Sequence, residues 1–240
     1  MRYFRIFFLG LLFACQPQVE EKQNIVIEPI AEGQSFNAAF LMIDGVYNSE
    51  LMAPYDIFQH TIFHAGDEAG IKVFTVAENM DTITSFEGLQ ILPDYAFDSE
   101  DLPEIDILVV PSAEHNMDSD LENETLINWV SQIGQDADYV MSLCDGAFVL
   151  AKAGLVNGKE STTFPTDIAR YRETFPSLTV HEGVSFVHHD NLLTSAGGAK
   201  SYDIALYLVH DLYGDKVAKG VGRGLVIDWD VNDYAFVIVE

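Results

Sequence analysis

Apolar and polar positions along the chain follow two alternating patterns. Short, mostly apolar runs, typical of buried strands of a sheet, occupy residues 38–43, 71–77, 105–110 and 139–143, and the first of them is continuously apolar. Apolar side chains at helical spacing follow them in residues 51–64, 123–133 and 201–213. Strands that alternate with helices predict an α/β fold, with a mostly parallel sheet covered by helices on both faces.

Shorter patterns fill the rest of the sheet region. Residues 80–93, split by Glu87 and Gly88, predict a pair of short strands. Residues 184–187 and 192–194 flank a polar turn, and late strands are expected at residues 224–228 and 234–239.

The first residues have the pattern of an export signal. Arg2 and Arg5 precede an apolar stretch, residues 6–13, that is too short to span a bilayer. The stretch ends in Leu-Phe-Ala-Cys, which resembles the lipobox of bacterial lipoproteins, and this implies cleavage before Cys15 and lipidation of its thiol. We therefore expect a signal peptide over residues 1–14, a tether over 15–36, a single domain over 37–240, and a lipid-anchored location in the bacterial cell envelope. An ordinary secretory peptide is the alternative.

Charge narrows the choice of partners. The chain has 12 Lys and Arg against 38 Asp and Glu, a formal net charge of -26. Binding to nucleic acid or to an anionic membrane surface depends on neutralising phosphates with cations, so neither partner is expected. A lipid anchor remains as the expected membrane contact, and a small molecule as the expected substrate.

The cysteine count leaves one thiol available for chemistry. The chain has 2 cysteines, and lipidation of Cys15 would leave Cys144 without a disulfide partner. The sequence contains no CxxC, HExxH or Cys/His cluster, so no metal and no cofactor is expected.

Cys144 lies where a buried strand is expected to turn into a helix. Residues 139–143 form the strand, and the helix is expected to begin at about Gly146, whose lack of a side chain permits a tight turn. Amides at the start of a helix favour a thiolate and stabilise an oxyanion, so this turn has the features of a nucleophile elbow. The alternative is a small buried cysteine that only packs well.

Three segments in the same order resemble one known family. They are residues 40–58 (FLMIDGVYNSELMAPYDIF), residues 142–165 (SLCDGAFVLAKAGLVNGKESTTFP) and residues 191–214 (NLLTSAGGAKSYDIALYLVHDLYG). The chain thus resembles the ThiJ/PfpI family of the class I glutamine amidotransferase-like superfamily, nearest to its isonitrile hydratase-like branch. The resemblance implies a flavodoxin-like three-layer sandwich with a Cys nucleophile elbow.

The resemblance also assigns two roles. Cys144 corresponds to the family's reactive cysteine, and Glu50 to the acidic residue that reaches the sulfur from the first helix. A carboxyl beside a thiolate is expected to be partly protonated, so Glu50 would donate a hydrogen bond to the sulfur or act as a general acid and base. A Glu that only stabilises the helix dipole is the alternative.

The sequence departs from the family pattern at three places. Phe164 stands where several relatives have His, which removes a Cys–His pair of the protease type. Asp145 stands where proteolytic members have His and isonitrile hydratases have Thr, and it would either oppose thiolate formation or cap the helix. Ser112 and Ala113 replace a Gly-Gly turn that supplies an oxyanion amide.

These comparisons complete the set of candidate residues. His115 follows a central strand, whose carboxyl end shares an edge with Cys144, so it is a candidate replacement base or an ordinary surface histidine. The catalytic candidates are Cys144, Glu50 and Asp145, and the binding candidates are Ser112, Ala113, His115 and Thr163.

Together, these features predict a cysteine-dependent hydratase- or hydrolase-like enzyme in which Cys144 attacks an electrophilic carbon. Two alternatives are a non-catalytic ligand-binding module on the same scaffold and a redox sensor that oxidises Cys144 to a sulfinate. Relatives often form dimers, so a homodimer is a further expectation.

Overall fold

The computed structural model describes residues 29, 33–66 and 68–239. The predicted signal peptide and Cys15 lie outside the described residues. The first half comprises β1 (Ser35–Leu41), α1 (Asn48–His60), β2 (Gly70–Ala77), β3 (Ile83–Thr84), β4 (Gln90–Ile91), β5 (Tyr95–Ala96), β6 (Ile107–Val110), α2 (Glu124–Asp136) and β7 (Tyr139–Leu143). The second half comprises α3 (Gly146–Lys152), β8 (Glu160–Ser161), α4 (Ile168–Thr174), β9 (Thr179–Val180), β10 (Phe186–His189), β11 (Leu192–Ser195), α5 (Lys200–Tyr213), α6 (Asp215–Gly224) and β12 (Phe236–Val239).

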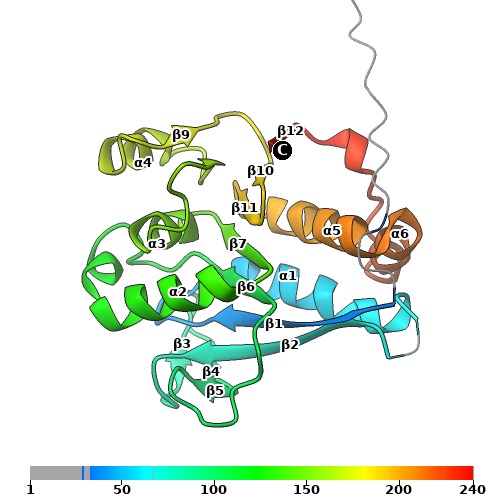
Figure 1. Ribbon diagram of the computed structural model, residues 1–240, viewed down its shortest axis with the longest axis horizontal. Coiled ribbons are helices and arrows are strands. Elements are labelled where there is room, and N and C mark those ends of the chain that lie inside the picture. Colours follow the sequence, from blue (N-terminus) through cyan, green and yellow to red (C-terminus); the bar gives the residue numbers. More distant parts are fainter. Residues whose placement is uncertain (1–28, 30–32, 67, 240) are drawn as a thin grey trace, which may run out of the picture.

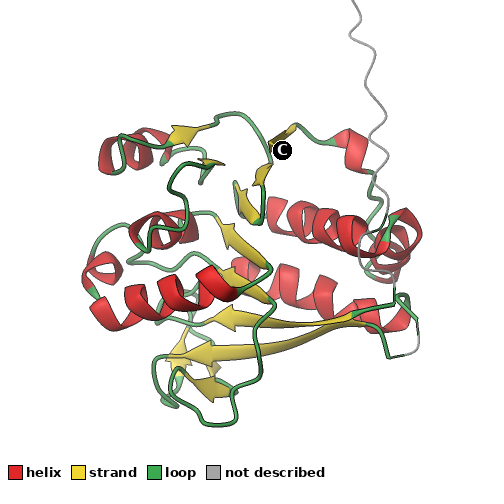
Figure 2. Ribbon diagram, viewed as in Figure 1, coloured by secondary structure: helices red, strands yellow, loops and turns green. Residues whose placement is uncertain are grey.

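An eight-stranded sheet forms the middle layer, in the order β12-β10-β11-β7-β6-β1-β2-β5 (Figure 1). All neighbouring pairs are parallel except β10 and β11, which are antiparallel. Helices α1, α5 and α6 lie on one side of the sheet and α2 and α3 on the other (Figure 2). This arrangement confirms the predicted α/β fold with a mostly parallel sheet.

Each face of the sheet has its own hydrophobic core. Along β1, Ala38 and Phe40 belong to one core, whereas Ala39 and Leu41 belong to the other, as the alternation of side chains in a strand requires. Both sets are almost fully buried, which explains why this strand has a continuous apolar sequence.

The parallel register brings three loops to one edge of the sheet. Val110 pairs with Ser142 at the ends of β6 and β7, and Ser195 pairs with Leu143 at the ends of β11 and β7. The residues that follow these strands therefore meet at the carboxyl edge, where α/β sheets commonly bind ligands.

The prediction of a strand at residues 224–228 is wrong. Residue 224 ends α6, and the chain then turns back, with the Ile227 N–H donating to the Gly222 carbonyl at 2.8 Å. An added Cβ at Gly222 would lie 2.9 Å from the Ile227 carbonyl oxygen, so glycine permits this close approach. Leu225 and Ile227 pack against the core from this turn, whereas Val226 between them is 94% exposed.

The expected pair of short strands in residues 80–93 is confirmed as β3 and β4, which pair antiparallel through Ile83 and Ile91.

Within the described part of the chain, none of the helices has the length and apolar character needed to cross a membrane.

Candidate active site

Cys144 occupies a strained turn between β7 and α3. Its φ is 53°, in the left-handed region, and its N–H donates to the Ser195 carbonyl at 2.9 Å. A non-glycine residue in this region costs about 1–2 kcal/mol, and such strain persists where the surrounding structure imposes it, commonly at functional sites. The predicted elbow is therefore present in the backbone.

Gly146 is the residue that makes the turn possible. An added Cβ at this position would lie 2.1 Å from the Val110 carbonyl oxygen, far inside van der Waals contact. The start of α3 can approach the end of β6 only without a side chain here, as the sequence predicted.

A second glycine, which the sequence analysis did not select, touches Cys144 directly. Gly197 has a φ of 74°, and a Cβ added there would lie 2.4 Å from the Cys144 Cβ. Its N–H donates to Ser195 Oγ at 3.1 Å, which fixes the turn after β11. Only its place in the Ser-Ala-Gly-Gly sequence of the family motif signalled this contact.

We expect Gly197→Ala to destabilise the protein by about 2–4 kcal/mol, because the methyl group would add strain at positive φ and displace Cys144. Urea unfolding would measure the loss. Gly198→Ala is the matched control, since Gly198 also has positive φ, at 57°, but an added Cβ would meet nothing within 4 Å. Equal losses in the two variants would contradict close packing of Gly197 on the elbow.

The protonation of the Cys144 thiol differs from expectation. Burial raises the pKa of Cys144 well above its ordinary value, and the charges of Asp145 and Glu50 raise it further. Hydrogen bonds from the Ser112 hydroxyl and the Asp145 amide lower the pKa by less. The expectation that the helix start favours a thiolate is therefore wrong for the resting site, because desolvation and two carboxyls outweigh the amide donors.

Asp145 points into the site rather than capping α3. It is 7% exposed, makes no side-chain cap, and its Oδ1 lies 3.0 Å from Thr163 Oγ1. Burial and the charge of Asp167 raise its pKa to about 6, although hydrogen bonds from Thr163 and from the Cys144 thiol lower it. A carboxyl that accepts the thiol's hydrogen and has a pKa near 6 is placed to exchange a proton with the sulfur.

Thr163 contacts both residues of the elbow, Cys144 and Asp145. Its hydroxyl lies 3.0 Å from both the Cys144 carbonyl and Asp145 Oδ1, and the residue is 1% exposed. A hydroxyl has one hydrogen, so it donates to one oxygen at a time, and both contacts are satisfied together when Asp145 is protonated and donates. Thr163 thus supports both protonation states of the carboxyl.

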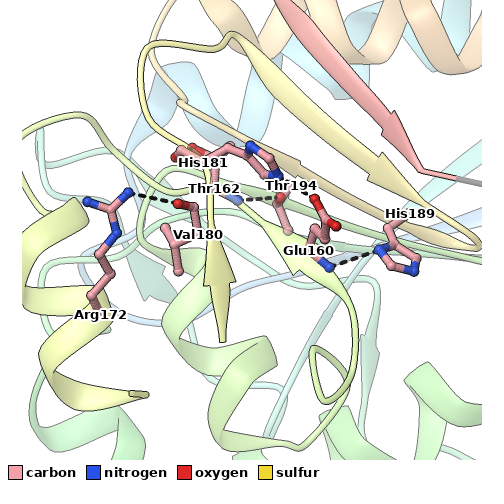
Figure 3. A network of polar contacts seen from close by, with 7 residues as sticks. All are labelled: Glu160, Thr162, Arg172, Val180, His181, His189 and Thr194. Carbon is pink, nitrogen blue, oxygen red and sulfur yellow. Dashed lines mark hydrogen bonds and ion pairs between the residues drawn. The ribbon is translucent and has the colours of Figure 1, made fainter. Parts of the chain in front are cut away.

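The segment before Thr163 is held by a polar network (Figure 3). The Thr162 N–H donates to Thr194 Oγ1 on β11, and the Glu160 N–H donates to His189 Nδ1 on β10, both at 2.9 Å. These contacts fix the segment to the main sheet and so hold the Thr163 hydroxyl at the elbow.

Glu50 is 4% exposed, yet its oxygens do not bind the sulfur. Oε1 accepts from the Gly198 N–H at 2.6 Å, and Oε2 accepts from the Ser201 hydroxyl at 2.9 Å. Burial raises the pKa of Glu50 despite these two donors, and the Cys144 thiol senses its charge. The structure therefore gives Glu50 a bracing contact with the turn that packs on Cys144.

Of the two residues that replace the Gly-Gly turn, only one faces the thiol. The Ala113 N–H donates to Asn116 Oδ1 at 2.8 Å, so this amide is already occupied, and its expected role as an oxyanion donor is wrong. Ser112 is fully buried, and its hydroxyl has no partner other than the neighbouring thiol. Its carbonyl accepts from the Tyr47 N–H, which positions the residue.

His115 lies on the surface of the same loop. Its side chain is 52% exposed, and its Nδ1 is 3.3 Å from Asp118 Oδ1. The structure gives it a surface ion pair rather than a contact with Cys144. Among residues 33–66 and 68–239, no group of three or more His, Cys, Asp or Glu side chains could hold a metal ion.

Comparisons with known proteins agree with this geometry. Isonitrile hydratase of Pseudomonas putida is 30% identical over 181 residues, which are 75% of this chain and 73% of that protein. A deglycase of Pyrococcus horikoshii is 28% identical over 126 residues, 52% of this chain and 70% of the deglycase. The crystal structure of Drosophila melanogaster DJ-1beta has a TM-score of 0.69 at 21% identity, covering 82% of this chain and 100% of that one, and shows the same fold.

A structure of a ThiJ/PfpI family protein from Pseudomonas syringae gives a TM-score of 0.68 at 22% identity, covering 92% of this chain and 85% of that one. The family model described as DJ-1/PfpI family matches residues 37–211, which include the elbow, Glu50 and the Gly197 turn. The resemblance seen in three sequence segments is thereby confirmed, and the chain belongs to the DJ-1/PfpI family.

Proposed function

We propose that this protein is a cysteine-dependent enzyme that adds water to a small electrophilic substrate, with an isonitrile as the first candidate. The observation that supports this most is the pairing of Cys144, held on a strained elbow, with the Asp145 carboxyl that accepts its thiol hydrogen. The similarity to an isonitrile hydratase supports the choice of substrate.

The first step forms a carbon–sulfur bond. Asp145 takes the thiol proton as the sulfur adds to the terminal carbon of R–N≡C, and the same carboxyl then gives that proton to the carbon. The product is a thioimidate, R–N=CH–S–Cys144, which contains every atom of both reactants. Nucleophile formation and proton transfer thus occur together, which suits a thiol whose resting pKa is raised.

The second step releases the cysteine. Water adds to the thioimidate carbon as Asp145 accepts one of its protons and passes it to the nitrogen, which gives R–NH–CH(OH)–S–Cys144. This tetrahedral adduct expels the sulfur as Asp145 accepts the remaining hydroxyl proton. The proton returns to the thiol, and R–NH–CHO leaves with one water added overall. The Ser112 hydroxyl beside the sulfur stabilises the departing thiolate.

Incubation with an aliphatic isonitrile tests the proposal. We expect the N-formamide, heavier by one water, in liquid chromatography–mass spectrometry, with repeated turnover by each protein molecule. A glycated amino acid, tested in parallel, examines the activity that the name of the Pyrococcus deglycase states. Saturable binding of such compounds without any product would overturn the enzyme proposal in favour of a ligand-binding module.

We also propose that the chain is exported and anchored through lipid on Cys15. The sequence Leu-Phe-Ala-Cys after an apolar stretch supports this. Expression in bacteria with a labelled fatty acid should label the protein, and Cys15→Ala should abolish the label. Labelling that persists in this variant would contradict the anchor.

Thr163→Val should shift the pH dependence of turnover upward and reduce stability. The variant keeps the side-chain volume but removes a hydrogen bond that lowers the pKa of Asp145, so the acidic limb should move above about pH 6. Removing the one hydroxyl that these two buried oxygens share should cost about 1–3 kcal/mol. Rate–pH profiles and urea unfolding measure both effects, and a limb that does not move would contradict the Thr163–Asp145 contact.

A further inference from the structure

Acidic groups gather near Cys144, around Tyr47, whose N–H donates to the Ser112 carbonyl at 3.0 Å. The charges of Glu114, Asp145 and Glu87 all act on the hydroxyl of Tyr47, as does the Cys144 thiol, so these groups gather around one half-buried tyrosine. Glu50 lies deeper and senses both Asp145 and Glu87. We use the term acidic entrance for Glu87, Glu114 and Asp145 around Tyr47.

Contacts fix the Glu87 carboxylate and the backbone of Glu114 within the acidic entrance. Glu87 Oε2 accepts from the Asn48 N–H at 3.0 Å, at the start of α1. The Glu114 N–H donates to the Gly45 carbonyl at 3.1 Å, and a Cβ added to Gly45 would lie 2.9 Å from the Glu114 Cβ. The Glu87 charge is therefore held in place, and the Glu114 side chain starts from a fixed point beside it.

Little positive charge opposes them. Arg170 lowers the pKa of Asp145, but its guanidinium donates to the Met117 carbonyl at 2.7 Å and is exposed to solvent, which screens it. Beside the carboxylates, the Tyr47 ring packs on Phe86 at 4.7 Å between centroids, and Phe86 is 53% exposed. An aromatic pair flanked by carboxylates is a favourable surface for an organic cation and a poor one for an anion.

A separate observation points to a ligand at this place. Ser112 is fully buried, and its hydroxyl has no partner outside the site, so a polar donor is held ready beside the sulfur. Beyond its contact with the thiol, the hydroxyl oxygen keeps its acceptor capacity unused, and a bound substrate or intermediate would use it.

We infer that the acidic entrance selects the substrate by charge, admitting neutral or cationic electrophiles to Cys144 and excluding anionic ones. This inference rests on the proposed use of Cys144 as the nucleophile. A cleft lined by charges of one sign changes the local concentration and association rate of a charged reactant by about 10–1,000-fold. Substrates with a carboxylate or phosphate would therefore react slowly, whereas isonitriles and amine-bearing electrophiles would not be hindered.

Three methanethiosulfonate reagents that differ in charge test the selection without requiring turnover. Each transfers its thioalkyl group to the Cys144 thiolate, forming a disulfide and releasing methanesulfinate. We would measure modification at Cys144 by peptide mass spectrometry with trimethylammonium, neutral and sulfonate reagents, and divide each rate by that of a small thiol. We expect the cationic reagent to exceed the anionic one by at least about tenfold in low salt, and the ratio to shrink in high salt.

Two double variants test whether the charge preference comes from the acidic entrance. Glu87→Gln combined with Glu114→Gln removes two charges and keeps the amide oxygens as acceptors, so most of the preference should disappear. Glu100→Gln combined with Glu104→Gln is the matched control, because these exposed residues precede β6 at the opposite edge of the sheet. An equal effect of both pairs, or a wild-type ratio near one, would overturn the inference while leaving Cys144 a nucleophile. A Cys144 that reacts with none of the reagents would contradict the proposed function as well.

Discussion

Cys144→Ser should lower kcat/KM for the hydrated substrate by at least about 10³-fold, while the folded structure remains intact. The hydroxyl has nearly the same size as the thiol, but it is a far weaker nucleophile without a dedicated base of matching strength. Asp145 exchanges a proton with a thiol and is too weak a base for an alcohol. Steady-state kinetics on purified protein measures the effect, and circular dichroism with urea unfolding verifies the fold.

A covalent intermediate gives this prediction a second readout. Rapid acid quenching of the wild-type protein during turnover should show a mass increase equal to the whole isonitrile, because the thioimidate keeps all its atoms. Cys144→Ser should show no adduct. If the serine variant retained a tenth or more of the wild-type activity, the sulfur would not be the attacking atom, and Asp145 would act on water directly.

The same thiol environment argues against the redox alternative. Oxidation requires the thiolate to attack the peroxide, and burial together with two neighbouring carboxyls holds the pKa of Cys144 above its ordinary value. A sensor cysteine needs the opposite arrangement, with nearby cations and open access. Raised pKa is compatible with a nucleophile that loses its proton to Asp145 only as the carbon–sulfur bond forms.

Much of the fold could be predicted because its strands are short, apolar and separated by clear helical patterns. The strand expected at residues 139–143 has the same limits as β7. Helix α6 was not predicted, because three of its ten residues are glycine, which disfavours a helix and suggests a loop. Its stability comes from packing against α5, which a local pattern does not reveal.

Features of the site that depend on residues close in sequence could be predicted, whereas contacts between distant segments could not. Gly146 was identified because it follows Cys144 in sequence, whereas Gly197 contacts Cys144 across 53 positions and needs the sheet register to be known. The direction of the shift in the Cys144 pKa was not predicted, because the helix start can be recognised from the local sequence but desolvation depends on the tertiary structure. Asn116, three residues after Ala113, is a local signal for the occupied amide.

Asp145→Asn should reduce kcat/KM by about 10²–10⁴-fold and abolish the acidic limb of the rate–pH profile. The amide keeps the shape and an oxygen for Thr163 but neither accepts the thiol proton nor returns it. In the wild type, activity should fall as pH drops below about 6, where Asp145 becomes protonated. Asp167→Asn is the companion variant: its charge raises the pKa of Asp145, so removing it should move the limb to lower pH with little loss of rate.

The free energy of unfolding should decrease as pH rises, because of the same Asp145 carboxyl. The folded-state pKa of Asp145, about 6, lies above its ordinary value of 3.8, so the native state binds more protons between these values than the unfolded state does. The contribution of Asp145 is therefore fully present below pH 3.8 and is lost as pH rises through about 6. Urea unfolding at pH 5 and pH 7.5 should show a smaller decrease in Asp145→Asn than in the wild type. If the variant kept both the acidic limb and the wild-type change in stability, another group would carry the proton, and Glu50, the other buried carboxyl beside the thiol, would be the residue to replace next.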